Sequence, residues 1–105
     1  PLFRPPFGGR RPGVLRAARH MGLETVMWSV TGFDWSAKSS ESIVHKVNRQ
    51  VEGRRARQSE IILLHDGGHL AFGADRSHTV EATRVLLEKH SATKQFVPVL
   101  ELARD

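Results

Sequence analysis

The sequence predicts an α/β fold built on parallel strands, in the order β-α-β-α-β-α-β. Two observations predict the alternation: short apolar runs bounded by turn residues, and between them longer segments whose apolar residues recur at helical spacing. A third is that polar and glycine-rich clusters follow the runs instead of preceding them, as they do at the active-site face of α/β barrels and open α/β sheets. Such alternation implies a parallel sheet, either open or closed into a barrel.

The chain begins with an expected strand end, turn and helix. Residues 1–4 are a short apolar stub, and the prolines and glycines of residues 5–9 continue neither a strand nor a helix. Apolar residues then recur at helical spacing over residues 11–21. Pro12 suits the first turn of that helix and Gly22 its C-terminal stop.

The middle of the chain repeats strand and helix. Residues 25–30 are apolar and β-branched without clear polar alternation, which predicts a strand covered on both faces. Ser39 or Ser40 can cap a second helix that stops at Gly53. Its inward face is expected to carry Ile43, Val44, Val47 and Val51. Another buried strand is expected over residues 60–64.

The last third predicts one more helix and one more strand. Ser77 and Thr79 mark the start of the helix. Its inward face is expected to carry Val80, Thr83, Leu86 and Leu87. Residues 95–99 predict the final strand, and Pro98 places it at an edge of the sheet.

Composition limits the classes of function. A chain of 105 residues buries one core, so it is a single domain or part of a larger one. The absence of cysteine excludes disulfides, thiolate zinc sites and a thiol nucleophile. The net charge is +5, but glutamates are interspersed among the arginines, which predicts a solvated surface and not a nucleic-acid-binding patch. The apolar runs are too short to span a bilayer.

Three clusters resemble the motifs of one family. RPPFG at residues 4–8, WSVTGFDW at residues 28–35 and ILLHDG at residues 62–67 stand in the order and approximate spacing of its third, fourth and fifth motifs. The family is that of the polysaccharide deacetylases with the NodB homology domain, carbohydrate esterase family 4, and the resemblance extends over essentially the whole chain. Many members have tyrosine where this chain has Phe7 and aspartate where it has Thr31.

The resemblance implies a fold and a reaction. The fold is a distorted (β/α) barrel, of which residues 1–105 would be the C-terminal portion. The reaction is hydrolysis of N-acetyl amides, or of O-acetyl esters, on chitin, peptidoglycan or a related polysaccharide, commonly at the cell envelope. A divalent metal such as zinc is implied, but its ligands and the aspartate base belong to the first two motifs, so no residue here is assigned to metal. The chain alone is expected to be inactive, and an exposed barrel edge beside its first strand to favour pairing between copies.

The resemblance also implies an acid and its partner. Hydrolysis of an amide expels an amine that leaves only when protonated, so the site needs a general acid. His65 is the candidate, and Asp34 is expected to face it and to stabilise the imidazolium. Arg4 resembles the arginine that pairs with the aspartate base.

Four further residues are implied in substrate binding. The backbone N–H of Phe7, in a loop stiffened by Pro6, is the expected oxyanion donor. Trp35 and Leu63 are expected to form a small apolar pocket for the acetyl methyl group, which would restrict the acyl group in size.

Other interpretations compete with this one. Taken singly, Arg4 and His65 suit surface and structural roles, Trp35 and Leu63 suit a core, and Asp34 suits a turn. The chain would then be a catalytically silent carbohydrate-binding or regulatory module that kept the cleft, or a basic α/β interaction domain. The basic segment at residues 52–59 has no functional assignment.

Overall fold

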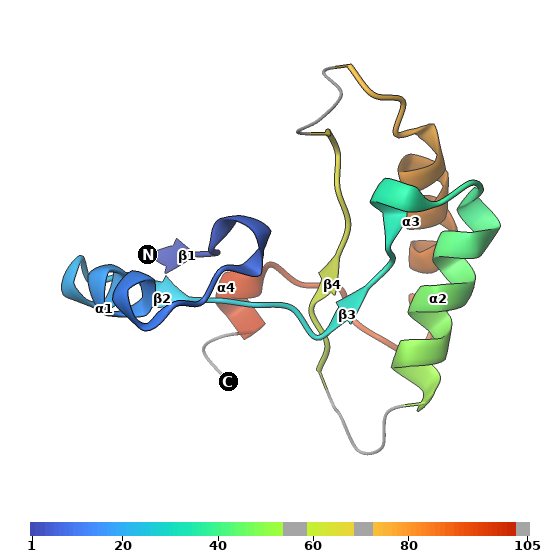
Figure 1. Ribbon diagram of the computed structural model, residues 1–105. Helices are drawn as coiled ribbons and strands as arrows, with labels where there is room; N and C mark the ends of the chain where they lie inside the picture. Colours follow the sequence, from blue (N-terminus) through green and yellow to red (C-terminus); the bar gives the residue numbers. More distant parts are fainter. Residues whose placement is uncertain (54–58, 69–72, 103–105) are drawn as a thin grey trace.

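The computed structural model describes residues 1–53, 59–68 and 73–102 (Figure 1). Its elements are β1 (Leu2–Phe3), α1 (Pro12–His20), β2 (Glu24–Thr25), β3 (Val30–Thr31), α2 (Ser40–Gly53), β4 (Ile62–Leu63), α3 (Ser77–His90) and α4 (Val99–Leu102). All strand pairs are parallel, β1 with β2 and β3 with β4. Figure 1 shows β1, β2 and α1 at one end of the molecule, α2 and α3 at the other end, and β3 and β4 between them. The α/β class with parallel strands is therefore confirmed.

Pro12 begins α1 and Gly22, at a φ of 72°, follows its end, as expected from the sequence. Only glycine adopts this left-handed conformation at little cost, so the chain turns there towards β2. The start of α2 is also as expected, because the side-chain oxygen of Ser39 accepts a hydrogen bond from the backbone N–H of Ser42 at 3.1 Å.

The single strand predicted over residues 25–30 is wrong, because the run is divided into β2 and β3. The backbone N–H groups of Ser29 and Val30 both donate to the carbonyl oxygen of Ile61, at 3.0 and 3.1 Å. Two successive N–H groups that donate to one carbonyl oxygen indicate a bulge. The extra residue interrupts the alternation by which successive N–H groups point to opposite edges of the strand. Before the bulge the run pairs with β1, through β2, and after it with β4, through β3. Of these residues only Val30 is fully buried, so the expected cover on both faces is also wrong.

The core lies where α2 and α3 pack on β3 and β4. It consists of Val30, Ile43, Val47, Ala82 and Leu86, with Val44 and Val51 partly buried against it. The inward face predicted for α2 is thus confirmed. The face predicted for α3 is right only in part: its buried residues are Thr79, Ala82, Leu86 and His90, so Leu86 is confirmed, whereas Leu87 is 43% exposed. Val80, predicted to face inward, is 69% exposed, because the buried face begins one residue earlier, at Thr79.

The final strand predicted over residues 95–99 is wrong. Residues 95–98 form no strand, and α4 begins at Val99. The carbonyl oxygen of Pro98 accepts a hydrogen bond from the backbone N–H of Glu101 at 3.0 Å. Pro98 lacks an N–H, so it suits the residue before a helix as well as it suits an edge strand.

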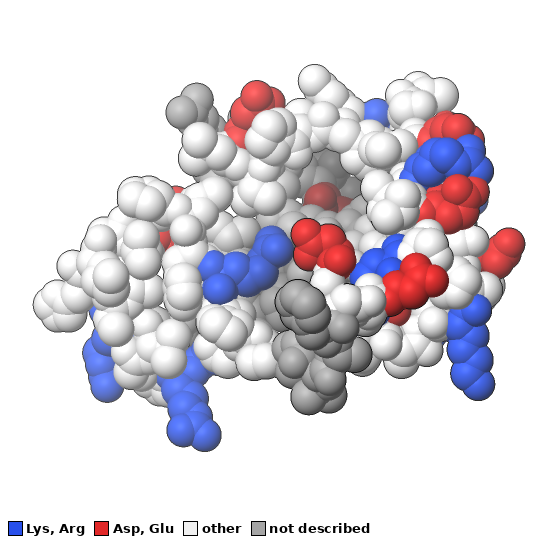
Figure 2. Space-filling model, turned by 90° about the horizontal axis from the view of Figure 1, so that it is seen from above, with Lys and Arg blue, Asp and Glu red and all other residues white. Residues whose placement is uncertain are grey.

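The molecule is flat and open. Its radius of gyration is 15.2 Å and its extents are 41 × 36 × 20 Å, whereas a compact domain of this length has a radius of gyration of about 13 Å. On the right-hand part of the face seen in Figure 2, basic and acidic side chains stand beside one another. Helical residues form ion pairs between Arg84 and Glu88 at 2.8 Å and between Lys89 and Glu52 at 3.2 Å.

Candidate active site

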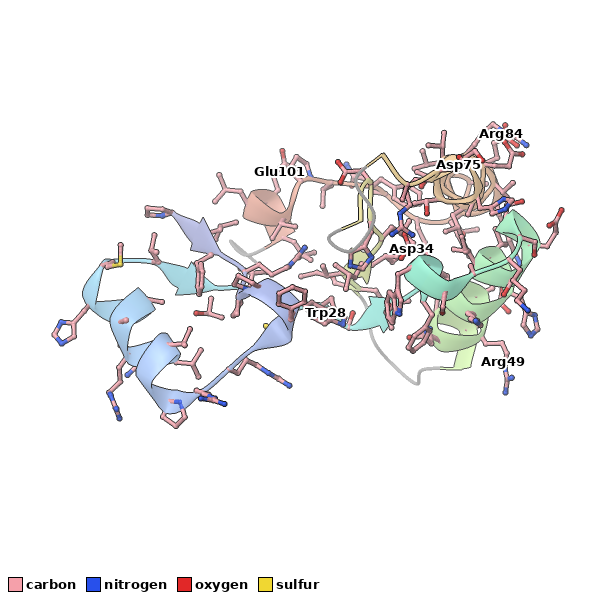
Figure 3. All side chains as sticks on the ribbon, turned by 45° about the horizontal axis from the view of Figure 1, so that its top comes forward. Trp28, Asp34, Arg49, Asp75, Arg84 and Glu101 are labelled. Atoms are coloured by element: carbon pink, nitrogen blue, oxygen red, sulfur yellow. The ribbon has the colours of Figure 1, made fainter. Side chains whose placement is uncertain are left out.

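Two strand ends bring Asp34 and His65 together. β3 ends at Thr31, and the chain turns through a left-handed Phe33 (φ 51°) into a short 3₁₀ turn that starts at Asp34. His65 follows the end of β4 by two residues. Because parallel neighbours end at the same edge of a sheet, the two side chains meet there. In Figure 3 the label of Asp34 lies near the middle of the molecule, where the turn after β3 faces the segment after β4.

The carboxylate of Asp34 accepts three hydrogen bonds. Its Oδ1 lies 2.8 Å from Nδ1 of His65, and its Oδ2 accepts the backbone N–H of His65 at 2.6 Å. Oδ2 also accepts the hydroxyl of Thr79 at 2.9 Å. Burial by itself raises the pKa of Asp34, but the hydrogen bonds from His65 and Thr79 outweigh it and hold that pKa below its ordinary value. Asp34 is therefore ionised at neutral pH.

The imidazole of His65 contacts a buried partner but is itself partly accessible to solvent. The side chain of Asp34 is fully buried, whereas 39% of the His65 side chain is exposed. A carboxylate only accepts hydrogen bonds, so Nδ1 of His65 carries a proton in this contact. Nε2 is then the nitrogen that can exchange a proton with a bound molecule. This is the arrangement of an acid or base whose orientation is set by a buried carboxylate.

An aromatic wall stands beside His65. The ring of Trp35 meets the imidazole edge-on, with centroids 5.5 Å apart and planes at 84°. Phe33 also lies against Trp35, with centroids 5.4 Å apart. Trp35 is 53% exposed, so its ring offers an apolar surface next to the polar pair. This is consistent with a surface that an acetyl methyl group could contact.

The second pocket residue expected from the sequence is Leu63 of β4, two residues before His65. Ile62 and Leu64 pack against the core, so Leu63, which is half-buried, points to the opposite face of β4. A cavity of about 500 Å³ does adjoin His65, but neither Trp35 nor Leu63 lines it. Its lining residues are Leu64, His65, Asp66, Arg76, Thr79, Val80 and Thr83.

The RPPFG loop belongs to the other end of the molecule. Arg4 is exposed, and its Nε donates to the carbonyl oxygen of Val26 at 3.4 Å. Phe7 is 85% exposed with a φ of 56°, and Pro6 is exposed beside it. A β-carbon at Gly8 would lie 2.9 Å from the Trp28 ring, so the loop packs closely on that side chain, which Figure 3 shows between the two ends. The structure thus joins Asp34 to His65 and places Arg4 with β1 and β2.

The described residues do not fit a metal site. Within residues 1–53, 59–68 and 73–102, no three histidine, aspartate or glutamate side chains are grouped so that they could hold an ion. The buried carboxylate of Asp34 already accepts three hydrogen bonds, which occupy the oxygens that a metal would need. In the same part of the chain, no helix is long and apolar enough to cross a membrane.

Sequence reasoning missed two residues that touch Asp34. Thr79 was recognised only as a marker of the start of a helix, although its hydroxyl binds a carboxylate 45 positions earlier. Arg76, to which no role was given, donates from Nη1 to the backbone carbonyl oxygen of Asp34 at 3.2 Å. Contacts over such separations leave no local pattern, so only the placement of α3 reveals them.

Several known proteins are similar to this chain in sequence. A peptidoglycan-N-acetylglucosamine deacetylase of Bacillus cereus is 40% identical over 106 residues, which covers 98% of this chain and 45% of the relative. A chitooligosaccharide deacetylase of Azorhizobium caulinodans is 37% identical over 65 residues, covering 62% of this chain and 29% of the relative. No family model matches the sequence.

A solved structure agrees with these relatives. The family 4 carbohydrate esterase of Streptomyces lividans, in complex with acetate, superposes with a TM-score of 0.63 at 26% identity and covers 87% of this chain and 40% of the esterase chain. The chain thus spans less than half the length of each of these relatives. In sequence the chain is similar to deacetylases of peptidoglycan and of chitooligosaccharide, and in fold it is similar to a family 4 carbohydrate esterase.

Proposed function

We propose that this chain supplies the general acid and part of the substrate pocket of a metal-dependent polysaccharide deacetylase. The substrate would be an N-acetylated, or O-acetylated, polymer such as chitin or peptidoglycan. One observation carries the proposal: the buried Asp34 binds Nδ1 of His65 at 2.8 Å while the imidazole stays accessible. The relatives named as deacetylases of peptidoglycan and chitooligosaccharide support the same reaction.

In this proposal His65 acts at the leaving group. The C–N bond of the tetrahedral intermediate breaks when the amine nitrogen receives a proton from Nε2 of the imidazolium, and the electron pair of that bond stays on nitrogen. Asp34, ionised at neutral pH, stabilises the imidazolium and keeps Nε2 directed away from itself. Trp35 would exclude water from one side of the acetyl group and limit its size.

We further propose that residues 1–105 are the C-terminal portion of a distorted (β/α) barrel. The open shape, with a radius of gyration of 15.2 Å, and the share of the relatives that the chain spans support this. The remaining strands would then pair with the free edge of β1, the same edge at which copies of this chain would otherwise pair. A divalent metal would be held by residues other than those described here. Arg4 and the backbone N–H of Phe7 would face that part of the site, while Leu63 would complete the pocket with Trp35.

The experiment is acetate release from N-acetylated chito-oligosaccharide by the full-length protein that contains this chain. Replacing His65 with alanine is expected to lower kcat by about 100-fold or more with little change in KM, because a positioned general acid contributes roughly 100- to 10,000-fold. His78→Ala is the matched control, since His78 is an exposed histidine of α3. A His65→Ala enzyme with near-normal kcat would remove His65 from the acid role.

A second function is favoured by one observation. The described residues hold no group of metal-binding side chains, which suits a carbohydrate-binding or regulatory module that kept the cleft. The same preparation distinguishes the two functions. A silent module would bind acetylated but not deacetylated oligosaccharide and would release no acetate, whereas an enzyme would release it.

A further inference from the structure

The start of α3 is joined to the Asp34–His65 pair by side chains. Thr79, in the first turn of α3, donates its hydroxyl to Oδ2 of Asp34 at 2.9 Å. Arg76, the residue before α3, donates from Nη1 to the backbone carbonyl oxygen of Asp34 and from Nε to that of Gly67, each at 3.2 Å. Two side chains from one helix start thus reach both loops that form the pair.

We propose that Thr79 and Arg76 are positioning residues: Thr79 fixes the carboxylate of Asp34 so that Oδ1 faces His65, and Arg76 fixes the distance between the loops after β3 and β4. The consequence for catalysis rests on the proposed function, but the positioning itself does not. Neither residue contacts a reacting atom in this account, so both act through Asp34 and His65.

Thr79 acts on the orientation of the carboxylate. Oδ2 of Asp34 has two donors, the Thr79 hydroxyl and the backbone N–H of His65, so the carboxylate plane is defined by three hydrogen bonds in all. Thr79 is 7% exposed and the Asp34 side chain is fully buried, so water has little access to replace a lost donor. Without the hydroxyl, the carboxylate can rotate away from Nδ1 of His65. The cost of burying its charge is then offset by fewer hydrogen bonds.

Arg76 acts on the spacing of the two loops. Its guanidinium donates in two directions from one rigid plane, to the loop that carries Asp34 and to the loop that carries His65 and Gly67. A lysine ammonium is a point charge and does not reproduce this fork. The distance of 2.8 Å between Nδ1 and Oδ1 therefore depends on a group outside the pair.

A purely structural role in starting α3 explains these contacts less well. Arg76 makes no side-chain capping hydrogen bond to the helix it precedes. The hydroxyl of Thr83, one turn later, instead binds within the helix, to the backbone carbonyl oxygen of Thr79 at 2.8 Å. Thr83 is therefore a matched control, because it is a threonine of the same helix that lines the same cavity but does not touch Asp34.

The first test measures His65 and Asp34 without any substrate. In the wild-type protein, ¹⁵N NMR of the neutral imidazole is expected to show the proton on Nδ1, and ¹³C NMR of the Asp34 carboxyl to show a low titration midpoint. Thr79→Val, which keeps the shape of the side chain, is expected to shift a measurable fraction of His65 to the Nε2–H tautomer and to raise the midpoint of Asp34. Thr79→Ser is expected to restore both, and Thr83→Val to leave both unchanged. Wild-type values in Thr79→Val would overturn the role of Thr79.

The second test measures turnover of N-acetylated chito-oligosaccharide by the full-length protein. Thr79→Val and Arg76→Lys are each expected to lower kcat by about tenfold at unchanged KM, a part of what a positioned acid contributes. Unchanged kcat in both variants would overturn the proposal. If Thr79→Val does not fold, the kcat of Arg76→Lys, compared with that of Thr79→Ser, which keeps the hydroxyl, decides it. A wild-type protein that releases no acetate refutes the proposed function, whereas the NMR result still decides the positioning.

Discussion

Asp34 is both buried and ionised, and a carboxylate rarely combines the two without hydrogen-bond donors around it. Its side chain is fully buried, yet its pKa lies below the ordinary value because His65 and Thr79 donate three hydrogen bonds to it. Burying an unpaired carboxylate would instead neutralise it. The position is therefore specific for an ionised group, and the partly exposed His65 is the side chain that contacts it.

The low pKa of Asp34 predicts how stability depends on pH. A carboxyl group with a lower pKa in the folded state than in the unfolded state binds its proton more weakly when folded. Its contribution to the free energy of unfolding is fully present above the unfolded value, near 3.8, and is lost as pH falls through the lower folded value. Asp34→Asn does not titrate, so urea unfolding is expected to show a shallower loss of stability below about pH 4. Equal slopes in the two proteins would contradict this.

At this scale the sequence predicted the pair but not its surroundings. Asp34 and His65 follow two strands in motifs whose order is visible along the chain, and their contact is confirmed. Thr79 and Arg76 could not be found in this way, because their roles depend on where α3 docks. The contact between Trp35 and His65 supports part of the expected pocket, while the roles of Arg4, Phe7 and Leu63 stay predictions.

Among the elements, the close approach of β3 to α2 sets the position of Asp34. A β-carbon at Gly32 would lie 2.8 Å from Cδ2 of Leu64 and 2.9 Å from Cγ2 of Ile43. The side-chain amide of Gln50 binds both backbone groups of Thr31, at 3.1 and 2.6 Å, on an edge with which none of the described strands pairs. The end of β3 is thus held by a helix on one side and by β4 on the other.

Gly32→Ala is expected to destabilise the protein by about 1–3 kcal/mol, as overpacking of a core does. The added methyl group would also push the turn that carries Asp34 away from His65, since Gly32 is two residues before it. Gly13→Ala is the control, because nothing lies within 4 Å of a β-carbon there and α1 gains a better helix former. Chemical denaturation measures both; equal stabilities of the two variants would contradict the packing argument.

The sequence predicted helices better than strands. α1 and α2 lie close to their expected bounds, and α2 has its expected face, because helical periodicity and capping are local properties of the chain. The strands depend on partners far away, so the bulge at Ser29 and Val30 could not be read from composition. The strand expected over residues 95–99 failed for the same reason, and Pro98 precedes α4 instead.

The whole molecule is divided into two ends that the bulged run connects. One end holds Arg4 with β1, β2 and α1, and the other holds Asp34 and His65 with the core (Figure 1). The open shape and the share of the relatives covered are consistent with the proposed larger barrel. Composition could limit the chain to one core but could not predict that this core would occupy one end only.

The central claim, that the Asp34–His65 pair protonates a leaving group, is tested most directly by comparing two substrates. An N-acetyl amide expels a poor leaving group that needs a proton, whereas 4-nitrophenyl acetate expels a phenolate that does not. With the full-length protein, His65→Ala is expected to lower kcat for the amide by about 100-fold or more and kcat for the aryl ester by less than about tenfold. An equal loss for both substrates would contradict the account, because it would show that His65 serves a step other than departure of the amine.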